Sequence, residues 1–179
     1  WFFGLHDYQR TRIVAFLNPA ADIRGAGYNA YQAVVAAGSG ELFGKGIGYG
    51  TQSKLRFLPE YETDFIFAAF AEEWGFVGVS LALLLYGLLL FNLLSIAQRA
   101  ATNFDAFFTI GIMLLFLAHV FIHAGINLGI LPVTGTTIPF MSYGGSHIVM
   151  EFAALGIVAS LARHGRSAPR EMAGQEYEG

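Results

Sequence analysis

The second half of the sequence alternates between long apolar runs and short polar connections. The apolar runs cover residues 76–97, 106–128 and 146–162. Each is near the roughly 20 residues that an α-helix needs to cross the hydrocarbon core of a bilayer. The pattern predicts an all-α integral membrane protein whose residues 76–163 contribute three transmembrane helices.

The third run is the least apolar of the three and contains Glu151. A carboxylate within a membrane span faces the protein interior and requires a partner there, so we expect this helix to lie inside a bundle. A nearby histidine is one candidate partner for Glu151. The alternative is a proton-relay role, which a transporter would use.

The basic residues predict which side of the membrane each connection faces. Arg99 lies between the first two spans and three arginines follow the third, whereas the loop at 129–145 contains neither Lys nor Arg. Basic residues in short flanks stay on the cytoplasmic side. We therefore expect an extracytoplasmic segment over 1–75, an outer loop over 129–145 and a cytoplasmic tail over 164–179.

The first 75 residues have a different pattern. Helical stretches around 8–17 and 28–37 are separated by turn-forming residues and followed by a glycine-rich strip at 38–50. Residues 65–71 are apolar again but end at an acidic pair, so we expect a short helix at the outer interface before the first span. The chain starts at Trp1, within what resembles the tail of an apolar segment, which predicts a C-terminal piece of a longer protein.

Composition agrees with a membrane protein and removes several classes of function. Hydrophobic residues make up 55% of the 179 residues and charged residues only 13%, against about 25% charged in soluble domains. The chain has no cysteine, so disulfides and thiolate chemistry are excluded. Its net charge of −3 shows no excess of basic residues of the kind that binds nucleic acid, and we expect no nucleic-acid partner.

The glycine-rich strip is only superficially similar to a phosphate-binding loop. It satisfies neither of the two nucleotide-binding glycine spacings, and no apolar strand precedes it. A looser interpretation stays open, in which flexible backbone together with Lys45, Lys54 and Arg56 holds a pyrophosphate outside the membrane.

Three carboxylates, Glu60, Glu62 and Asp64, lie directly before the apolar segment that starts at residue 65. Known N-cap preferences favour Thr63 or Asp64 as the cap of the following helix, with the glutamates in solvent. The functional alternative is a carboxylate partly desolvated at the membrane surface. Such a group can act as a general base on a hydroxyl or bind a divalent cation.

A polar stripe crosses the second span, where His119, His123 and Asn127 recur every four residues on one helical face. The histidine spacing suits a metal, but the stripe supplies no third ligand of the usual kind. Hydrogen bonds between helices are the favoured interpretation.

The connection at 131–146 cannot form a continuous helix, because it contains two prolines and three glycines. Irregular backbone near membrane depth is tolerated only where protein or a water-filled cavity covers it. The connection is therefore predicted to line a cavity.

Five motifs, taken in order, resemble the SEDS family (shape, elongation, division and sporulation). They are Gly25-Ala-Gly-Tyr-Asn29, Gly50-Thr-Gln-Ser53, Leu58-Pro-Glu-x-x-Thr-Asp-Phe-Ile-Phe67, Ala71-Glu-Glu-x-Gly75 and Pro139-Phe-Met-Ser-Tyr-Gly-Gly-Ser146. The resemblance extends to about Arg163. Thr134 and Arg56 stand where division-type members often carry a lysine and an acid, so the chain is more similar to elongation-type members.

The resemblance implies a fold and an activity. SEDS proteins are bundles of about ten membrane helices with a large structured extracytoplasmic loop, so this chain would be the C-terminal part of such a bundle. Family members polymerise lipid II, the undecaprenyl-pyrophosphate-linked disaccharide pentapeptide, into glycan strands and release undecaprenyl diphosphate. We therefore expect a peptidoglycan glycosyltransferase of cell elongation, located in the bacterial cytoplasmic membrane.

The family's essential acidic residue falls on Asp64. The resemblance thus favours Asp64 as the catalytic residue, acting as general base or as a ligand of a divalent cation, Mg²⁺ or Mn²⁺. The predicted substrate-binding residues are Lys45, Lys54, Arg56, Glu60, Thr63 and Ser142.

The implied partners are lipid II, membrane lipid, a class B penicillin-binding protein acting as transpeptidase, and other cell-elongation proteins. Three alternatives stay open at this point. They are a lipid II flippase or other transporter, a division-type polymerase, and a non-enzymatic scaffold for the cell-wall machinery.

Overall fold

The structure, a computed structural model, describes residues 12, 16, 26–50 and 63–164, which contain helices and no β-strand. The helices are α2 (Ala26–Ser39), α4 (Ile66–Gln98), α5 (Asn103–Asn127) and α6 (Gly145–His164). Helices α4, α5 and α6 are long and apolar enough to cross a membrane. The all-α membrane class predicted from the apolar runs is thus confirmed. Most of the predicted helix at 8–17 lies outside the described residues, whereas α2 covers the stretch predicted at 28–37.

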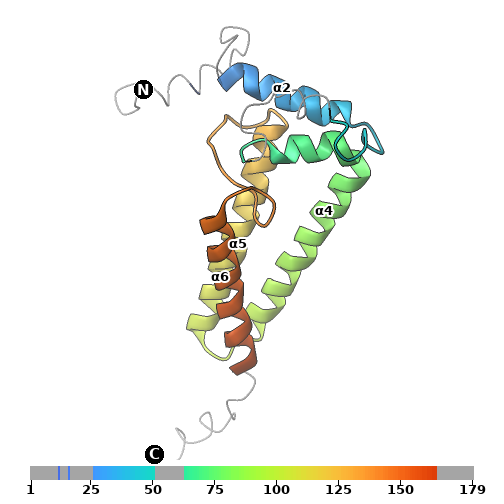
Figure 1. Ribbon diagram of the computed structural model, residues 1–179. Coiled ribbons are helices and arrows are strands. Elements are labelled where there is room, and N and C mark those ends of the chain that lie inside the picture. Colours follow the sequence, from blue (N-terminus) through green and yellow to red (C-terminus); the bar gives the residue numbers. More distant parts are fainter. Residues whose placement is uncertain (1–11, 13–15, 17–25, 51–62, 165–179) are drawn as a thin grey trace, which may run out of the picture.

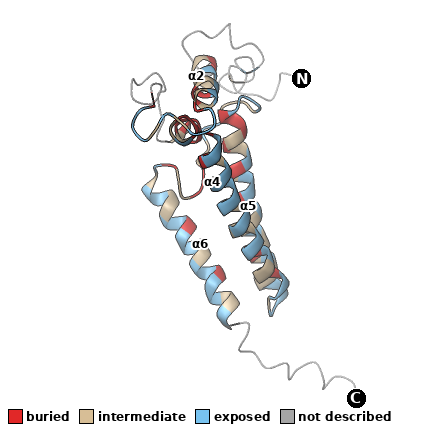
Figure 2. Cartoon of the chain, turned by 90° about the vertical axis from the view of Figure 1, so that its right-hand side faces the viewer, coloured by how far each residue is buried: buried red, intermediate tan, exposed pale blue. Residues whose placement is uncertain are grey.

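The helices are arranged as a transverse layer above three descending helices (Figure 1). Helix α2 lies across one end of the molecule, and the first turns of α4 run beneath it. The rest of α4, together with α5 and α6, descends from that end. Figure 2 shows that buried residues gather where α2, the start of α4 and the end of α5 meet.

Small side chains allow α2 to approach the other helices closely at this end. Ala33 and Ala36 of α2 are buried against Phe65, Ala68 and Ile126, which belong to the start of α4 and the end of α5. Further along the long helices, all three share a cluster of Leu93, Phe116 and Val158. The helices are therefore packed together at two levels along their length.

The outward faces of the long helices are apolar. Exposed large side chains include Leu81, Leu84, Leu88 and Phe91 on α4, Phe107 and Phe121 on α5, and Val149 and Phe152 on α6. In a membrane protein such faces contact lipid tails or further helices. They agree with the membrane-spanning assignment of α4, α5 and α6.

Helix α4 is broken at Gly75, which has φ of 64° and ψ of −167°. This backbone conformation is essentially restricted to glycine. It divides α4 into a short helix, residues 66–74, and a long helix, residues 76–98, which point in different directions (Figure 1). A short helix before the first span was predicted from residues 65–71, and its place at a membrane interface stays a prediction.

The glycine-rich strip wraps around this break, and we call residues 40–49 the glycine clasp. Four backbone hydrogen bonds of 2.8–3.1 Å connect it to the two helix ends: Lys45 N–H to Glu72 O, Gly46 N–H to Glu73 O, Phe76 N–H to Glu41 O, and Val77 N–H to Leu42 O. Orphan carbonyls at the end of the short helix and orphan N–H groups at the start of the long helix are thereby paired. A Cβ at Gly44 would lie 2.1 Å from Glu73 O, so the approach requires glycine there.

Candidate functional site

Asp64 lies directly before α4 and faces the connection between α5 and α6. The residue is partly buried, and a Cβ built on Gly135 would lie 3.4 Å from Asp64 Oδ2. The irregular connection predicted to line a cavity therefore passes beside the carboxylate predicted to be catalytic. Because Gly135 has no side chain, its backbone can approach this carboxylate closely.

Asn127, at the end of α5, holds the start of α4 in place. Its Oδ1 accepts a hydrogen bond from Ala68 N–H at 3.0 Å, and its Nδ2 donates to Asp64 O at 3.1 Å and His123 O at 2.8 Å. The Asn127 side chain is fully buried. It joins two segments that are about 60 residues apart in sequence and fixes the backbone of Asp64.

The predicted capping role of Thr63 or Asp64 is wrong. Phe65 occupies the N-cap position of α4 and makes no side-chain capping bond. The N–H of Ala68, three residues further on, instead bonds to the Asn127 amide. The capping acceptor comes from another helix, which local spacing does not reveal.

Ser142 binds the backbone of Thr63, the residue that precedes Asp64. Its hydroxyl donates to Thr63 O at 3.1 Å and accepts from Ile138 N–H at 2.9 Å, and the residue is only 2% exposed. The structure thus brings Thr63, Asp64 and Ser142 together, with Ser142 engaged in positioning the backbone of Thr63. Substrate contact by Ser142 and Thr63 stays a prediction.

The connection itself is fixed by polar contacts from the surrounding elements. These are Arg12 Nη1 donating to Val133 O at 3.2 Å, His123 Nδ1 with Thr136 O at 2.7 Å, Thr137 Oγ1 with His147 Nε2 at 3.0 Å, Tyr86 O–H donating to Pro139 O, and Phe140 N–H donating to Glu151 Oε2 at 2.9 Å. Every long helix supplies at least one of them. The connection therefore has a defined position relative to α4, α5 and α6.

Glu151 has the histidine partner expected from the sequence. Its Oε1 lies 2.8 Å from His147 Nδ1, one helical turn earlier in α6, at ion-pair distance but without hydrogen-bond alignment. The polar stripe on α5 behaves as predicted at His123 and Asn127, which bond to other elements, but the buried His119 Nδ1 has no hydrogen-bond partner in the described part of the chain. Glu151 is 5% exposed, and its second oxygen supports the connection through Phe140.

Lys45 lies away from Asp64, at the other end of the short helix. Its Nζ forms an ion pair of 2.8 Å with Glu72, whose side chain is fully buried. Glu72 is eight residues beyond Asp64, which corresponds to about 12 Å along a helix. The structure therefore connects Lys45 with the break at Gly75 more directly than with Asp64. Lys54, Arg56 and Glu60 lie outside the described residues.

The described residues contain no group of three or more His, Cys, Asp or Glu side chains placed to hold a metal ion. Mg²⁺ commonly binds through one or two carboxylates together with substrate phosphates. The partly buried Asp64 suits that mode of binding.

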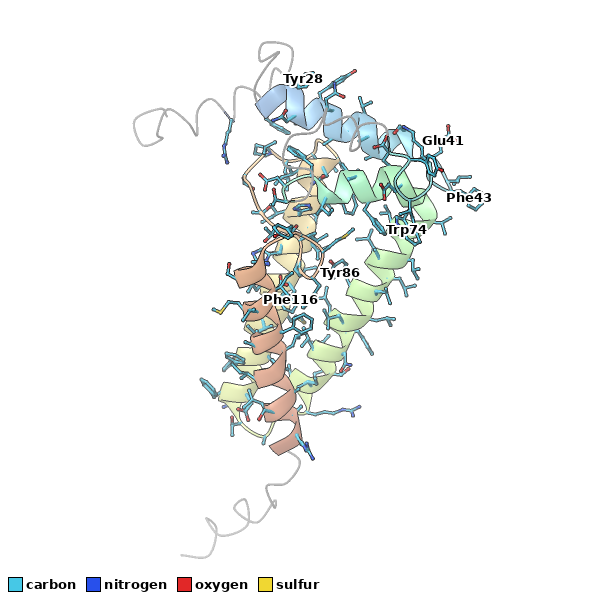
Figure 3. The ribbon with its side chains drawn as sticks, in the orientation of Figure 1. Tyr28, Glu41, Phe43, Trp74, Tyr86 and Phe116 are labelled. Atoms are coloured by element: carbon cyan, nitrogen blue, oxygen red, sulfur yellow. The ribbon has the colours of Figure 1, made fainter. Side chains whose placement is uncertain are left out.

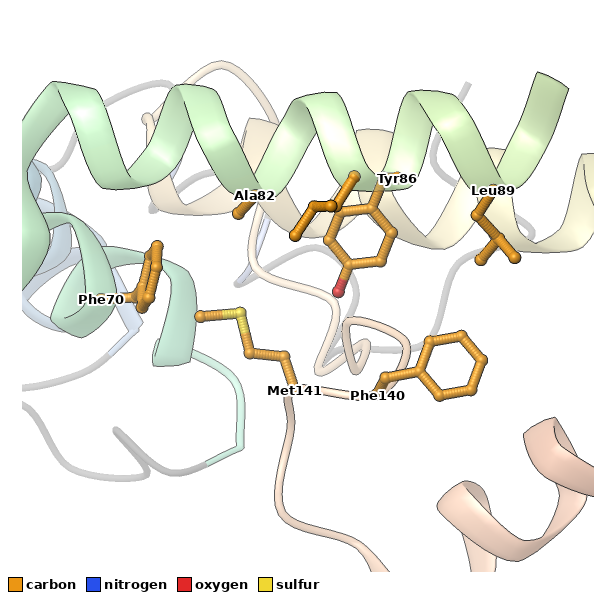
Figure 4. A pocket seen from close by; sticks show the side chains of 7 residues that line it. Phe70, Ala82, Tyr86, Leu89, Phe140 and Met141 are labelled. Atoms are coloured by element: carbon orange, nitrogen blue, oxygen red, sulfur yellow. The ribbon is translucent and has the colours of Figure 1, made fainter. Parts of the chain in front are cut away.

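An apolar pocket of about 380 Å³ lies between α4 and the connection. Figure 4 shows Phe70, Tyr86 and Met141 pointing into it, with Phe140 at its edge. The Tyr86 hydroxyl is turned toward the connection, where it bonds to Pro139 O. The pocket suits hydrocarbon better than a sugar or a phosphate, because nearly all of its lining is apolar.

Fold and site together define a multi-pass membrane protein with a polar site at one end of its helices. The family model described as "Cell cycle protein", of FtsW, RodA and SpoVE, matches residues 1–167. Peptidoglycan glycosyltransferase MrdB of Escherichia coli is 50% identical over 164 residues, which are 92% of this chain and 44% of MrdB. Stage V sporulation protein E of Bacillus subtilis is 42% identical over 159 residues, 89% of this chain and 43% of that protein.

Two solved structures are also similar. A chain from a peptidoglycan synthase complex, studied for the coordination of polymerisation and crosslinking, matches with a TM-score of 0.71 and 35% identity, covering 92% of this chain and 44% of that chain. Thermus thermophilus rod-shape-determining protein RodA, solved as an aspartate-to-alanine variant, matches with a TM-score of 0.55 and 44% identity. That match covers 56% of this chain and 34% of RodA.

The chain belongs to the SEDS family of FtsW, RodA and SpoVE proteins. The fold class and the family predicted from the five motifs are confirmed. The chain spans a little under half the length of the curated relatives given above. Sequence reasoning did not find the role of Asn127 at Asp64 or that of Tyr86 at Pro139. The polar stripe on α5 was the signal for the first, and nothing local pointed to the second.

Proposed function

We propose that this chain is part of a peptidoglycan glycosyltransferase that polymerises lipid II during cell elongation and releases undecaprenyl diphosphate. The observation that carries the proposal is Asp64, which lies in a family motif and is held against an irregular connection at one end of the membrane helices. The 50% identity to a peptidoglycan glycosyltransferase supports the activity. The similarity to a rod-shape-determining protein supports the elongation role.

In this reaction an acceptor sugar hydroxyl attacks the anomeric carbon of the donor. A new glycosidic C–O bond forms, the bond from that carbon to the pyrophosphate oxygen breaks, and the hydroxyl proton goes to a base. Asp64 would be that base. Its backbone is held by Asn127 and that of Thr63 by Ser142, so the carboxylate starts from a fixed position.

Asp64 would alternatively hold a divalent cation, Mg²⁺ or Mn²⁺, which supplies positive charge for the departing pyrophosphate. Lys54 and Arg56 would bind the same pyrophosphate. The apolar pocket between α4 and the connection is suited to part of the polyprenyl chain.

The partner we propose is a class B penicillin-binding protein acting as transpeptidase. The similar chain from a synthase complex that couples polymerisation to crosslinking supports this partner. Other cell-elongation proteins would join the same assembly. The C-terminus would lie in the cytoplasm, because arginines follow α6.

The test is polymerisation of purified lipid II by the full-length protein with its transpeptidase partner. We expect Asp64→Ala and Asp64→Asn each to lower the polymerisation rate by at least about 100-fold, the scale of general base catalysis. Glu41→Gln, at an exposed carboxylate of the glycine clasp, is the matched control and should retain the wild-type rate. Glycan of wild-type length and amount from Asp64→Ala protein would refute the role of Asp64.

The same preparation separates the polymerase from the transporter alternative. In vesicles carrying labelled lipid II on one side, a flippase accelerates transfer of the label across the bilayer. We expect no acceleration and normal glycan synthesis. Transport without glycan synthesis would reject the proposed activity.

A further inference from the structure

The tip of the glycine clasp exposes a cluster of large apolar side chains. The exposed fractions are 60% for Leu42, 82% for Phe43, 69% for Ile47 and 72% for Tyr49. Trp74, the last residue before the break in α4, is 46% exposed. In Figure 3 Phe43 projects away from the body of the molecule at the corner where Trp74 also lies. Such a cluster requires a partner surface.

This cluster continues directly into the outward face of the long part of α4. Phe76 and Val77, its first residues, are 65% and 53% exposed, and their N–H groups bond to Glu41 O and Leu42 O of the clasp. The clasp is therefore level with the first turn of a helix that is apolar enough to cross a membrane. A surface continuous with the apolar face of a membrane-spanning helix, at the level of its end, is expected in the interfacial region of the bilayer.

Five N–H groups of the clasp tip are paired within the protein. They donate as follows: Gly44 to Gly40 O, Lys45 to Glu72 O, Gly46 to Glu73 O, Gly48 to Glu73 Oε1, and Tyr49 to Gly46 O. A loop whose N–H groups are paired internally can enter a poorly hydrated layer without the cost of unpaired backbone groups. In a solvent-exposed loop, water can satisfy the backbone N–H groups instead.

Residues 42–49, the tip of the clasp, include few charged side chains. Lys45 is the only charged residue between positions 42 and 49, and its ammonium is paired with buried Glu72 at 2.8 Å. Tyr49 and Trp74 belong to the two residue types that are enriched where a membrane meets water. The tip thus presents mainly aromatic and aliphatic side chains, with the exposed Glu41 at its start and Lys45 paired with Glu72.

We propose that residues 42–49 form an interfacial anchor, which inserts Phe43, Ile47 and Tyr49 into the leaflet where the long part of α4 begins. The occupant of this surface is lipid. The proposal is independent of the glycosyl transfer proposed above. Because the clasp holds both sides of the break at Gly75, its insertion fixes the depth of the short helix, and with it Asp64.

The experiment uses the full-length protein without native cysteines in lipid nanodiscs. A nitroxide is attached to Phe43→Cys or Ile47→Cys, and its accessibility to oxygen and to a water-soluble nickel chelate is measured by electron paramagnetic resonance. Leu84→Cys, exposed on the long part of α4, is the lipid reference, and Tyr31→Cys, exposed on α2, is the water reference. We expect an oxygen-to-nickel ratio at 43 and 47 several-fold above that at 31. Nickel accessibility like that of residue 31, or exclusion of both reagents as in a protein contact, would overturn the proposal.

A second measurement guards against effects of the label at the tip. With the nitroxide moved to Tyr49→Cys, the double change Phe43→Ser and Ile47→Ser should shift residue 49 toward nickel accessibility. The matched change Phe43→Leu and Ile47→Val keeps the tip apolar and should leave the ratio unchanged. An identical ratio in all three proteins would show that the apolar tip does not set the depth of the loop.

Discussion

At the scale of single residues, Asn127 connects the end of α5 to the backbone around Asp64. One buried amide caps α4 through Ala68 N–H, holds Asp64 O and closes back on its own helix through His123 O. These three bonds all reach backbone atoms, so Asn127 determines position and supplies no reacting group. Asn127 is a positioning residue for Asp64.

Replacing Asn127 by Leu should leave the N–H of Ala68 and the carbonyl of Asp64 without their buried partner. Each lost partner costs about 1–3 kcal/mol, and displacement of Asp64 should lower the polymerisation rate by at least about tenfold. The rate is measured at a temperature where variant and wild type are equally folded, so that the loss reports position and not unfolding.

Asn92→Leu is the matched control, because Asn92 is an exposed amide on α4. Its polymerisation rate should equal that of wild type. A folded Asn127→Leu protein with an unchanged rate would contradict the positioning role.

At the scale of elements, the break in α4 and the glycine clasp form one unit. The conformation of Gly75 turns the chain, and the clasp satisfies the helix ends that the turn leaves open. The glycines of the strip allow this close approach to the helix ends. Their spacing therefore suits the break in α4 and not a nucleotide-binding loop. The unit directs the short helix, and hence Asp64, away from the axis of the span.

Gly75→Ala should lower the free energy of unfolding, because alanine does not fit the backbone conformation at the break in α4. Its φ and ψ lie where a side chain costs about 1–3 kcal/mol, and the added Cβ would lie 2.3 Å from Gly44 N. Denaturant titration of the full-length protein in detergent should show this loss as a lower unfolding midpoint.

Gly87→Ala is the control for that titration, because Gly87 is helical and an added Cβ meets no atom within 4 Å. It should be neutral or slightly stabilising, by up to about 1 kcal/mol. Equal stability of the Gly75→Ala and Gly87→Ala proteins would mean that the break is not a required feature.

At the scale of the whole molecule, sequence and structure agree where the signal is local. The apolar runs were sufficient to predict α4, α5 and α6, since length and hydropathy decide membrane spanning within one segment. The partner of Asn127 and the passage of Gly135 beside Asp64 could not be predicted, because these contacts join residues 63 and 71 positions apart. Local periodicity contains no information about which distant segments meet.

The orientation of the molecule in the membrane gives a prediction at the same scale. The positions of the arginines predict that the loop at 129–145 lies outside and the turn between α4 and α5 inside. With a membrane-impermeant maleimide, Tyr143→Cys should be labelled in intact cells, whereas Ala101→Cys should react only after permeabilisation. Both positions are exposed, so the reverse pattern would invert the assigned topology.

The way in which the connection is fixed links the site to the packing of α6. Glu151 holds Phe140 N–H, Ser142 holds Thr63 O, and only a few residues separate these two contacts. We therefore expect that a helix packing against the exposed Val149 and tilting α6 also moves the backbone next to Asp64. We expect the position of the carboxylate to depend on the assembly of the surrounding bundle, because hydrogen bonds connect α6 through the connection to residue 63.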